Sequence, residues 1–242
     1  MRLDKLLGNM GYGSRKEIKS LLKKKHISVN ETIIKDGSVH VDPDSDIIKV
    51  QGDIVHYQKY IYLMMNKPPG FISATADKVD KTVIDIVSKD YQHFNPFPVG
   101  RLDKDTEGLL LLTNDGDLAH QLTSPKKDVP KSYYAKIDGF VTEADISSFK
   151  SGIVLEDGYK AKPAKLTILH AGNESEIEIA ITEGKYHQVK RMFEAVDKKV
   201  TYLKRLTMGN LKLDENLRLS EYRELTDQEL NYCFSLTKEK KS

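Results

Sequence analysis

The sequence predicts an α+β protein with a mainly antiparallel or mixed sheet and flanking helices, preceded by a small basic domain. Strand-like runs alternate with helical patterns between residues 61 and 234, and the connections between them are short. The 242 residues suffice for one or two domains. The composition, 39% hydrophobic and 31% charged, is that of an ordinary globular protein. This interleaving favours helices packed on a sheet over a doubly wound parallel fold.

The N-terminal part is predicted to fold as two helices followed by strands. Ser14 is followed three positions later by Glu17, the capping-box spacing that satisfies free amide groups at the start of a helix over residues 14–25. Apolar residues of this helix recur on one stripe, which leaves its basic residues on the other faces. A shorter helix at residues 3–7 precedes it, and residues 27–34 alternate as a hairpin with an Asn in the turn.

Positive charge is concentrated in this N-terminal part. Eight Lys or Arg and two acidic residues give residues 1–30 a net charge of +6, whereas the whole chain carries +2. A second basic patch, residues 185–205, carries +5. Such polarity suits a polyanionic partner, although a solvated Lys-rich helix is the commoner meaning of a charge run.

A linker at residues 55–60 separates the N-terminal part from a second domain. The strands of the second domain are expected at residues 61–65, 109–112, 133–137, 165–169, 176–181 and 200–206. Its helices are expected at residues 82–87, 118–122, 143–150, 186–196 and 227–234. The predicted domains are residues 1–58 and 59–235, and residues 236–242 are expected to form a disordered tail.

The sequence also excludes several classes of protein. The one cysteine, Cys233, cannot form an internal disulfide, which fits a reducing compartment. Neither Cys233 nor His187 has partners at the spacing of metal ligands. The N-terminus lacks a signal-peptide pattern, and no run approaches about 18 apolar residues. We therefore expect a cytoplasmic protein that does not enter a membrane.

Residues 100–116, GRLDKDTEGLLLLTNDG, crowd carboxylates around one apolar run. An isolated Asp usually caps a turn, and Asp105 and Thr106 are candidates for hydrogen bonds that hold this one. The segment LDKDT also satisfies the Asp-x-Asp-x-Thr pattern of magnesium-dependent phosphotransferases of the haloacid dehalogenase type. In those enzymes the motif follows a hydrophobic strand, whereas here the apolar residues 109–112 come after it. The phosphotransferase is therefore an alternative interpretation.

The first 30 residues, MRLDKLLGNMGYGSRKEIKSLLKKKHISVN, resemble the S4 RNA-binding domain. The resemblance implies an αL-like pair of helices and a hairpin that present basic side chains to structured RNA. The side chains that it assigns to RNA binding are Arg2, Arg15, Lys16, Lys19 and Lys23.

Nearly the whole chain resembles the RsuA-type, small-subunit branch of the bacterial pseudouridine synthases. The segments that carry this resemblance are NKPPGFIS, GRLDKDTEGLLLLTNDG, LTSP, KSYY, KPAKL, EGKYHQVKRMFEAV and EYRELT. It implies an enzyme that isomerises a specific uridine of 16S ribosomal RNA to pseudouridine, with no cofactor and no metal. The implied partner is 16S ribosomal RNA or a small-subunit assembly intermediate, and we expect a monomer.

The same resemblance assigns roles to individual residues. Asp103 is the catalytic aspartate, and Tyr133 stacks on the target uracil. Lys190 pairs with the aspartate, and we expect it to keep Asp103 ionised. Arg101 matches an arginine that can occupy the space left by a flipped-out base, and Arg191 belongs to the RNA-binding set.

The implied reaction breaks the N-glycosidic bond of uridine, turns the uracil and rejoins it through carbon 5. An ionised carboxylate is needed near the ribose, either as a nucleophile or to assist an elimination. The base must leave its stack, which costs a few kcal/mol, and stacking on an aromatic ring returns roughly 1 to 3 kcal/mol. A second hypothesis is a non-catalytic RNA-binding factor of ribosome assembly.

Overall fold

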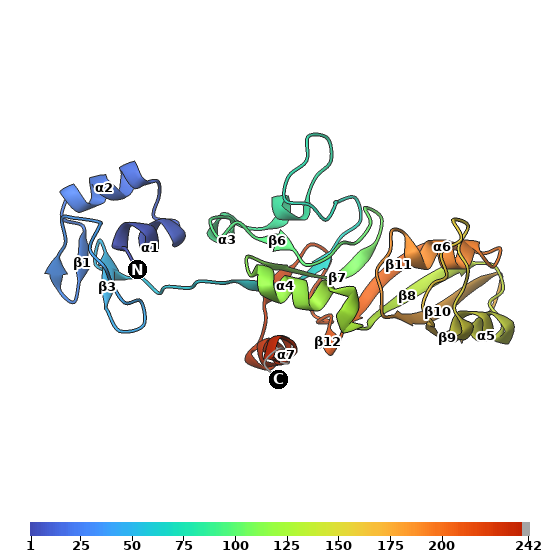
Figure 1. The fold of residues 1–242 in the computed structure, drawn as a ribbon. Coiled ribbons are helices and arrows are strands. Elements are labelled where there is room, and N and C mark those ends of the chain that lie inside the picture. Colours follow the sequence, from blue (N-terminus) through green and yellow to red (C-terminus); the bar gives the residue numbers. More distant parts are fainter. Residues whose placement is uncertain (239–242) are drawn as a thin grey trace. The chain divides into compact units, whose positions relative to one another are not determined.

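The computed structural model describes residues 1–238 and divides the chain into two compact units (Figure 1). The N-terminal unit comprises residues 1–61 and 87–96, and the second unit comprises residues 62–86 and the chain from Phe97 onward. The α+β class and the mainly antiparallel mixed sheet are confirmed. Within residues 1–238, no helix is both long enough and apolar enough to span a bilayer.

The N-terminal unit packs two helices on a small antiparallel sheet. The helices are α1 (Leu3–Asn9) and α2 (Arg15–Lys23). The strand order is β2 (Thr32–Ile33), β1 (Ile27–Val29), β3 (Ile48–Val50) and β4 (Asp53–Ile54). Leu3, Leu6 and Leu7 of α1 are fully buried against apolar residues of α2 and the sheet, so one continuous core holds this unit together.

The predicted capping box at the start of α2 is confirmed. The Ser14 amide donates to Glu17 Oε2 at 2.7 Å, and the Glu17 amide donates to Ser14 Oγ at 3.4 Å. The hairpin is also confirmed, because Val29 pairs with Thr32 across a two-residue turn. Asn30 in that turn has φ +49°, a left-handed conformation that Asn tolerates better than most residues.

Residues 87–96 were expected in the second domain, but they group with the N-terminal unit. They contain the short helix α3 (Lys89–Gln92). The ring of His93 lies where a side chain at Gly11 would be, with its nearest atom 2.9 Å from an ideal Cβ. This contact joins segments some 80 residues apart, which a reading of local pattern does not reveal.

The second unit is built on a nine-stranded sheet within the described residues. Its main path is β13 (Tyr222–Glu224), β5 (Tyr62–Lys67), β7 (Glu107–Thr113), β11 (Lys199–Met208), β8 (Lys131–Asp138), β10 (Glu174–Ile181) and β9 (Lys165–His170). Two short strands lie off this path, β6 (Phe97–Pro98) beside β7 and β12 (Leu211–Lys212) beside β11. Along the main path only β7 and β11 pair in parallel.

Gly108 is required where β7 and β11 meet. It has φ +100°, and a Cβ there would lie 2.3 Å from the main-chain oxygen of Arg205. The two strands therefore approach too closely for any side chain at this position. This junction sits directly after the acidic segment of residues 100–107.

The helices of the second unit are α4 (Gly116–Thr123), α5 (Glu143–Ser151), α6 (Gln188–Glu194) and α7 (Asp227–Lys238). The helix expected at residues 82–87 is a short 3₁₀ turn, Val83–Ile86, and a second 3₁₀ turn covers Pro125–Lys127. Helix α6 is shorter than the expected residues 186–196, because residues 184–187 form a turn before it. Rings of Phe149 and Phe193 pack α5 on α6, with centroids 4.8 Å apart.

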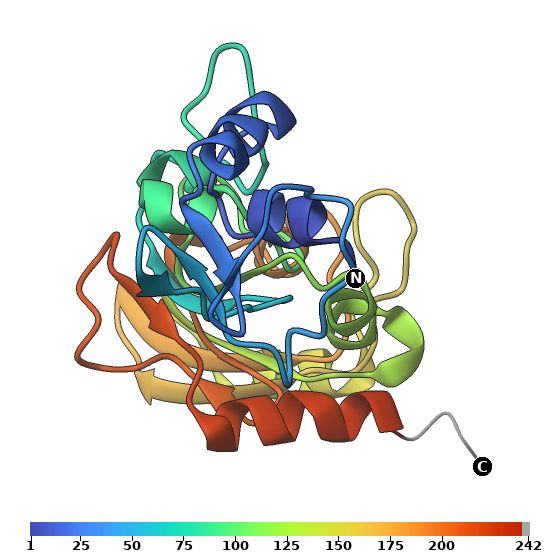
Figure 2. The same cartoon turned by 90° about the vertical axis from the view of Figure 1, so that its left-hand side faces the viewer.

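Helix α7 extends beyond its predicted end and includes part of the expected tail. It is seen end-on in Figure 1 and along its length in Figure 2, close to α4. Residues 236–238 are helical, because Leu236 packs on the core formed by α4, β5 and β7. The rest of the expected tail, residues 239–242, lies outside the described residues.

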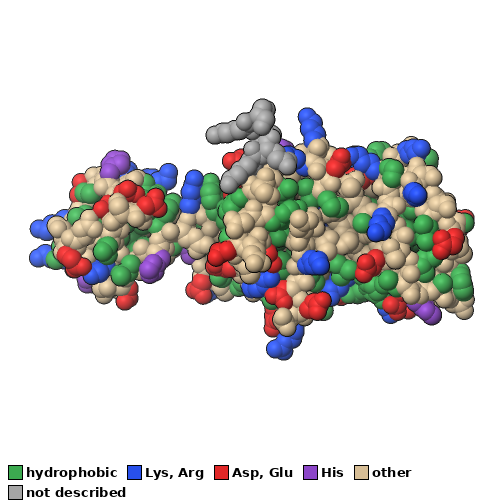
Figure 3. Space-filling view, turned by 90° about the horizontal axis from the view of Figure 1, so that it is seen from below, with side chains coloured by type: hydrophobic (Ala, Val, Ile, Leu, Met, Phe, Trp, Pro, Cys, Tyr) green, Lys and Arg blue, Asp and Glu red, His purple; other side chains and the backbone are tan. Residues whose placement is uncertain are grey.

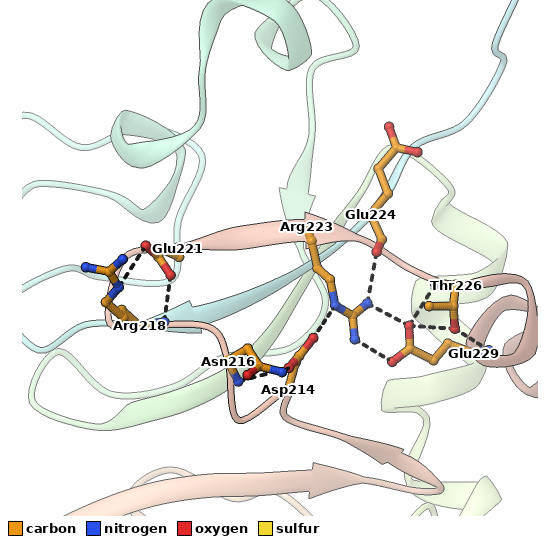
Figure 4. A network of polar contacts seen from close by, with 8 residues as sticks. All are labelled: Asp214, Asn216, Arg218, Glu221, Arg223, Glu224, Thr226 and Glu229. Carbon is orange, nitrogen blue, oxygen red and sulfur yellow. Dashed lines mark hydrogen bonds and ion pairs between the residues drawn. The ribbon is translucent and has the colours of Figure 1, made fainter.

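A cluster of polar side chains fastens the start of α7 to the edge strand β13 (Figure 4). Arg223 Nε donates to Asp214 Oδ2 at 2.7 Å, and its Nη1 and Nη2 donate to the two oxygens of Glu229 at 2.8 and 2.9 Å. These carboxylates raise the pKa of Arg223 further above its ordinary value, and Arg223 lowers the pKa of Glu229.

Candidate active site

A cavity of about 430 Å³ opens in the second unit where several segments of the chain meet, and the residues singled out from the sequence line it. Three of the segments are the loop before β7, strands β8 and β11, and the turn between β10 and α6. Asp103, Tyr133, Lys190 and Arg101 all line this cavity. The fold therefore brings together side chains separated by up to 89 positions in the sequence.

Asp103 lies between two basic side chains at this cavity. Lys190 Nζ is 3.3 Å from Asp103 Oδ2, and His187 Nε2 is 3.6 Å from Asp103 Oδ1. The Asp103 side chain is 28% exposed, so it is accessible from the cavity. Lys190 also donates to both oxygens of Asp105, at 2.7 and 2.9 Å. The expected pairing of Lys190 with Asp103 is present, but the hydrogen bonds to Asp105 are shorter.

The charges of this cluster depend on one another. Burial by itself raises the pKa of Asp105, but the hydrogen bond and charge of Lys190 outweigh that effect, so the pKa lies below its ordinary value. Burial lowers the pKa of Lys190, and the charges of Asp105 and Asp103 more than restore it. Lys190 therefore stays protonated and provides a fixed positive charge beside both carboxylates.

Lys67, which the sequence analysis did not single out, holds the loop that carries Asp103. It is fully buried at the end of β5, and its Nζ donates to the carbonyl oxygens of Thr106 at 2.8 Å and of Pro68 and Asp103 at 3.0 Å. Burial lowers the pKa of Lys67 to about 8, against the raising effect of the charges of Asp105 and Asp103. The signal in the sequence was a lysine directly after a buried apolar strand.

Hydrogen bonds of Asp105 and Thr106 were expected to hold this turn, but the side chains of these two residues do not supply them. The carboxylate of Asp105 is bound to Lys190, and Thr106 Oγ1 is buried with no hydrogen-bond partner among residues 1–238. The main chain closes the turn instead, because the Thr106 amide donates to the Asp103 carbonyl at 3.1 Å. Ser73 adds a clamp, since its Oγ accepts from the Leu102 amide and donates to the Leu102 carbonyl.

The remaining carboxylates of this acidic segment have structural partners. Glu107 accepts a hydrogen bond from the Tyr202 hydroxyl at 2.7 Å. Asp115 caps α4, because its Oδ1 accepts from the amides of Asp117 and Leu118 at 3.1 Å. Asp103 thus differs from Glu107 and Asp115 in facing the cavity.

The start of α6, which presents Lys190, is fixed by a buried carboxylate. Glu183 is 6% exposed and accepts from the Tyr159 hydroxyl at 2.5 Å, the Lys162 amide at 2.9 Å and Gln188 Nε2 at 2.5 Å. These bonds join the loop after β10 to residues 159–162. Lys190 therefore has a defined position before any ligand binds.

Tyr133 and Arg101 occupy different parts of the cavity. Tyr133 lies in β8 and is 7% exposed, so its ring belongs to the wall of the cavity rather than to an open surface. Arg101 is an exposed residue of the loop before β7. Arg205 of β11 also lines the cavity, is 2% exposed, and donates from Nε to the Leu109 carbonyl at 2.7 Å.

The second basic patch is weaker than its sequence charge suggests. Arg205 is buried in the wall of the cavity, and Lys198 pairs with Asp145 at 2.9 Å. Arg191, expected to bind RNA, pairs with Asp157 at 2.5 Å. These basic groups are engaged inside the fold, which counting charges along the sequence does not reveal.

The first basic patch, by contrast, lies at the surface of the N-terminal unit. Arg15, Lys16, Lys19 and Lys23 are exposed on α2, while the opposite side of this helix is buried. Arg2 is exposed and forms an ion pair with Asp4 at 2.6 Å. Lys and Arg side chains project from this unit at the left of Figure 3.

The fold does not provide the context of the phosphotransferase motif. Residues 103–106 precede the long apolar strand β7, and the strand before them, β6, has only two residues and is separated from them by a loop. Among the described residues, no group of three or more His, Cys, Asp or Glu is arranged to hold a metal ion.

Comparison with known proteins agrees with this architecture. Residues 61–195 match the family model described as RNA pseudouridylate synthase, and residues 1–47 match that of the S4 domain. An uncharacterized RNA pseudouridine synthase of Bacillus subtilis, YtzG, is 53% identical over 96% of this chain and 97% of its own. The ribosomal small subunit pseudouridine synthase A of Vibrio vulnificus is 38% identical over 96% of this chain and 98% of its own.

Two further matches extend over almost the full length. The ribosomal large subunit pseudouridine synthase B of Bacillus subtilis is 38% identical over 95% of this chain and 93% of its own. A crystal structure of a pseudouridylate synthase superimposes with a TM-score of 0.68 at 34% identity, covering 96% of this chain and 99% of that one. The chain therefore belongs to the RNA pseudouridine synthases, enzymes that isomerise uridine in RNA, and it carries an S4 domain at its N-terminus.

Proposed function

We propose that this enzyme isomerises a specific uridine of 16S ribosomal RNA and that Asp103 is its catalytic residue. The observation that carries the proposal is the cavity in which a partly exposed Asp103 carboxylate lies between Lys190 and His187. An aspartate that only caps a turn does not need to face a cavity, nor to lie beside a lysine that is itself held by a second carboxylate. Lys67 binds the main chain of the loop that carries Asp103, which supports a fixed position of the Asp103 carboxylate for catalysis.

In the proposed reaction the target uridine leaves its stack and enters the cavity. The Asp103 carboxylate acts at the ribose, either by attacking C1′ or by assisting an elimination, while the bond from C1′ to N1 of uracil breaks. The uracil turns, C5 bonds to C1′, and the C5 proton is lost while N1 gains one. Tyr133 supplies a ring against which uracil stacks, and Lys190 provides a positive charge 3.3 Å from the Asp103 carboxylate.

The S4 domain supplies affinity for the phosphate backbone in this proposal. The exposed side chains of Arg15, Lys16, Lys19 and Lys23 on α2 form no ion pair with any residue of the described chain 1–238, in contrast to Arg191 and Lys198. Binding through such contacts weakens with salt in proportion to the number of phosphates engaged. We include Arg2 and Arg101 in the RNA-binding set, with Arg101 filling the space that the flipped base leaves.

A large-subunit target is the second candidate function. The named small-subunit and large-subunit relatives are equally similar to this chain, at 38% identity each. The wording of the EGKYHQVKRMF segment favours the small-subunit branch. The experiment must therefore examine both ribosomal RNAs.

The test is comparative mapping of pseudouridine in 16S and 23S ribosomal RNA from cells with and without the protein. One pseudouridine in 16S RNA should disappear without the protein and return with the wild-type gene. Asp103→Asn should not restore it, and its rate in vitro should fall at least about 1,000-fold, as expected for loss of a catalytic group. Asp117→Asn, an exposed change in the same segment, serves as the matched control and should restore it.

A missing pseudouridine in 23S RNA would instead support the large-subunit candidate. An active Asp103→Asn enzyme would overturn the catalytic assignment.

A further inference from the structure

Tyr186 is an exposed aromatic residue at the cavity that the proposed reaction does not yet use. Its side chain is 73% exposed, although it lines the same cavity as Asp103. One face of its ring stacks on the His187 ring, with centroids 3.8 Å apart and planes 15° apart. His187 in turn approaches Asp103, with its Nε2 3.6 Å from Oδ1. The two rings therefore form a stack that leads outward from the catalytic carboxylate.

The turn that carries these rings is held in place from both ends. The Gln188 amide donates to the Lys185 carbonyl at 3.2 Å, and the Lys185 amide donates to Gln188 Oε1 at 2.9 Å. The Lys185 ammonium also lies over the ring of Tyr159, 4.9 Å from its centroid. Tyr186 thus sits at the tip of a doubly closed turn, so its exposed position is defined by the fold.

The backbone at His187 supports a functional role for this turn. His187 has φ +50° and ψ +31°, a left-handed conformation that residues other than glycine seldom adopt. Such conformations persist where the surrounding structure enforces them and are concentrated at functional sites. Here the conformation places the His187 ring between Tyr186 and Asp103.

We infer that the outer face of Tyr186 stacks on the base of a nucleotide adjacent to the extruded uridine, which makes Tyr186 a substrate-binding residue. This inference rests on the proposed function. Extrusion of a base leaves its neighbour without one stacking partner, and aromatic side chains recognise such unstacked bases. Tyr133 is buried in the cavity wall, where the target uracil enters, whereas Tyr186 is exposed at the rim, where the adjacent nucleotide remains.

The test uses an RNA hairpin around the uridine identified by mapping, with 2-aminopurine on its 5′ or its 3′ side. Wild-type enzyme and Tyr186→Phe should quench the fluorescence of one of these probes, because both present an aromatic face. Tyr186→Leu should not quench it, and its KM should rise about 10-fold with kcat changed less than about 2-fold, since the lost stacking contributes binding rather than chemistry.

Phe140→Leu is the matched control, because it makes the same change at an exposed ring, 56% accessible, that does not line the cavity. It should leave quenching and both kinetic constants as in the wild type. Equal quenching and equal KM for wild type and Tyr186→Leu would overturn the inference, as would a loss in kcat alone. If wild type forms no pseudouridine in the hairpin, the proposed function itself has failed.

Discussion

Two regions of the second unit are each organised around one basic side chain, but in opposite ways. At the candidate active site Lys67 is fully buried and binds main-chain carbonyl oxygens, and burial lowers its pKa to about 8. At the start of α7 Arg223 is partly exposed and binds the carboxylates of Asp214 and Glu229, which raise its pKa. Among residues 1–238, no carboxylate forms an ion pair with Lys67, whereas Arg223 pairs with two carboxylates.

The difference reflects what each region must leave available. Lys67 uses no carboxylate of the loop, so Asp103 faces the cavity and Asp105 binds Lys190. Lys67 instead holds the loop by its backbone, and its burial is unfavourable for the charged form. Neither Asp214 nor Glu229 lines the cavity, so both carboxylates can bind Arg223 and stabilise the fold. The comparison predicts that changes at Lys67 affect activity most and changes near Arg223 affect stability alone.

Of the changes that bear on this comparison of two cations, Lys67→Met is expected to have the largest effect. The variant removes the donor to four carbonyl groups around Asp103, and a displacement of about 1 Å in a catalytic group lowers the rate roughly 100-fold. The measurement is kcat on the mapped hairpin, with circular dichroism to verify folding. A well-folded Lys67→Met enzyme with wild-type kcat would show that the loop is positioned by other contacts.

The same residue predicts a pH dependence of stability. The pKa of Lys67 is about 8 in the folded protein against an ordinary value of 10.5, so the unfolded chain binds more protons between these values. The free energy of unfolding should therefore rise with pH from 8 to 10.5 in wild type, relative to Lys67→Met. Denaturant titrations of both proteins at pH 7.5 and pH 10 measure the difference in the free energy of unfolding between wild type and Lys67→Met. A constant difference would mean that Lys67 is not buried as a cation.

A smaller effect is expected for Lys190→Met. Lys190 holds the pKa of Asp105 below its ordinary value, so removing Lys190 should make Asp105 easier to protonate and should leave Asp103 without its lysine partner. We expect kcat to fall about 10-fold and the acidic limb of the pH–rate profile to move to higher pH. Lys190→Arg should keep the wild-type limb. An unmoved limb in Lys190→Met would contradict the role of this cation.

The smallest effect is expected for Glu229→Gln near Arg223. The free energy of unfolding should fall by about 1 kcal/mol, because a partly buried, two-point ion pair becomes a weaker hydrogen bond. The pKa of Glu229 is lowered, so its contribution is present above its ordinary value of 4.5 and is lost as the pH falls through the folded value. Thermal unfolding at pH 7 and pH 3.5 tests this. A change in kcat would contradict the prediction that changes near Arg223 affect stability alone.

The features that could be predicted best from the sequence were those that depend on a few neighbouring residues. The Ser14 and Glu17 spacing defined the start of α2, and apolar runs located β5, β7 and β8. The residues that meet at the cavity followed from resemblance to a family, not from spacing. Lys67 and Arg205 were missed because burial of a cation depends on which carbonyl groups the tertiary fold brings to it. The roles of Asp103, Tyr133 and Lys190 stay predictions until the variants are measured.

The parallel pairing of β7 with β11 has a consequence for biosynthesis. Gly108 and Arg205 are neighbours in the sheet, but about 100 residues of chain separate them. At synthesis rates of about 5–20 residues per second, β7 waits roughly 5–20 s for its partner strand to leave the ribosome. During that interval β7 can pair with β5 and β6 but lacks β11, and Asp103 lacks Lys190. The nascent enzyme therefore cannot act on RNA near its own site of translation until most of the chain has emerged.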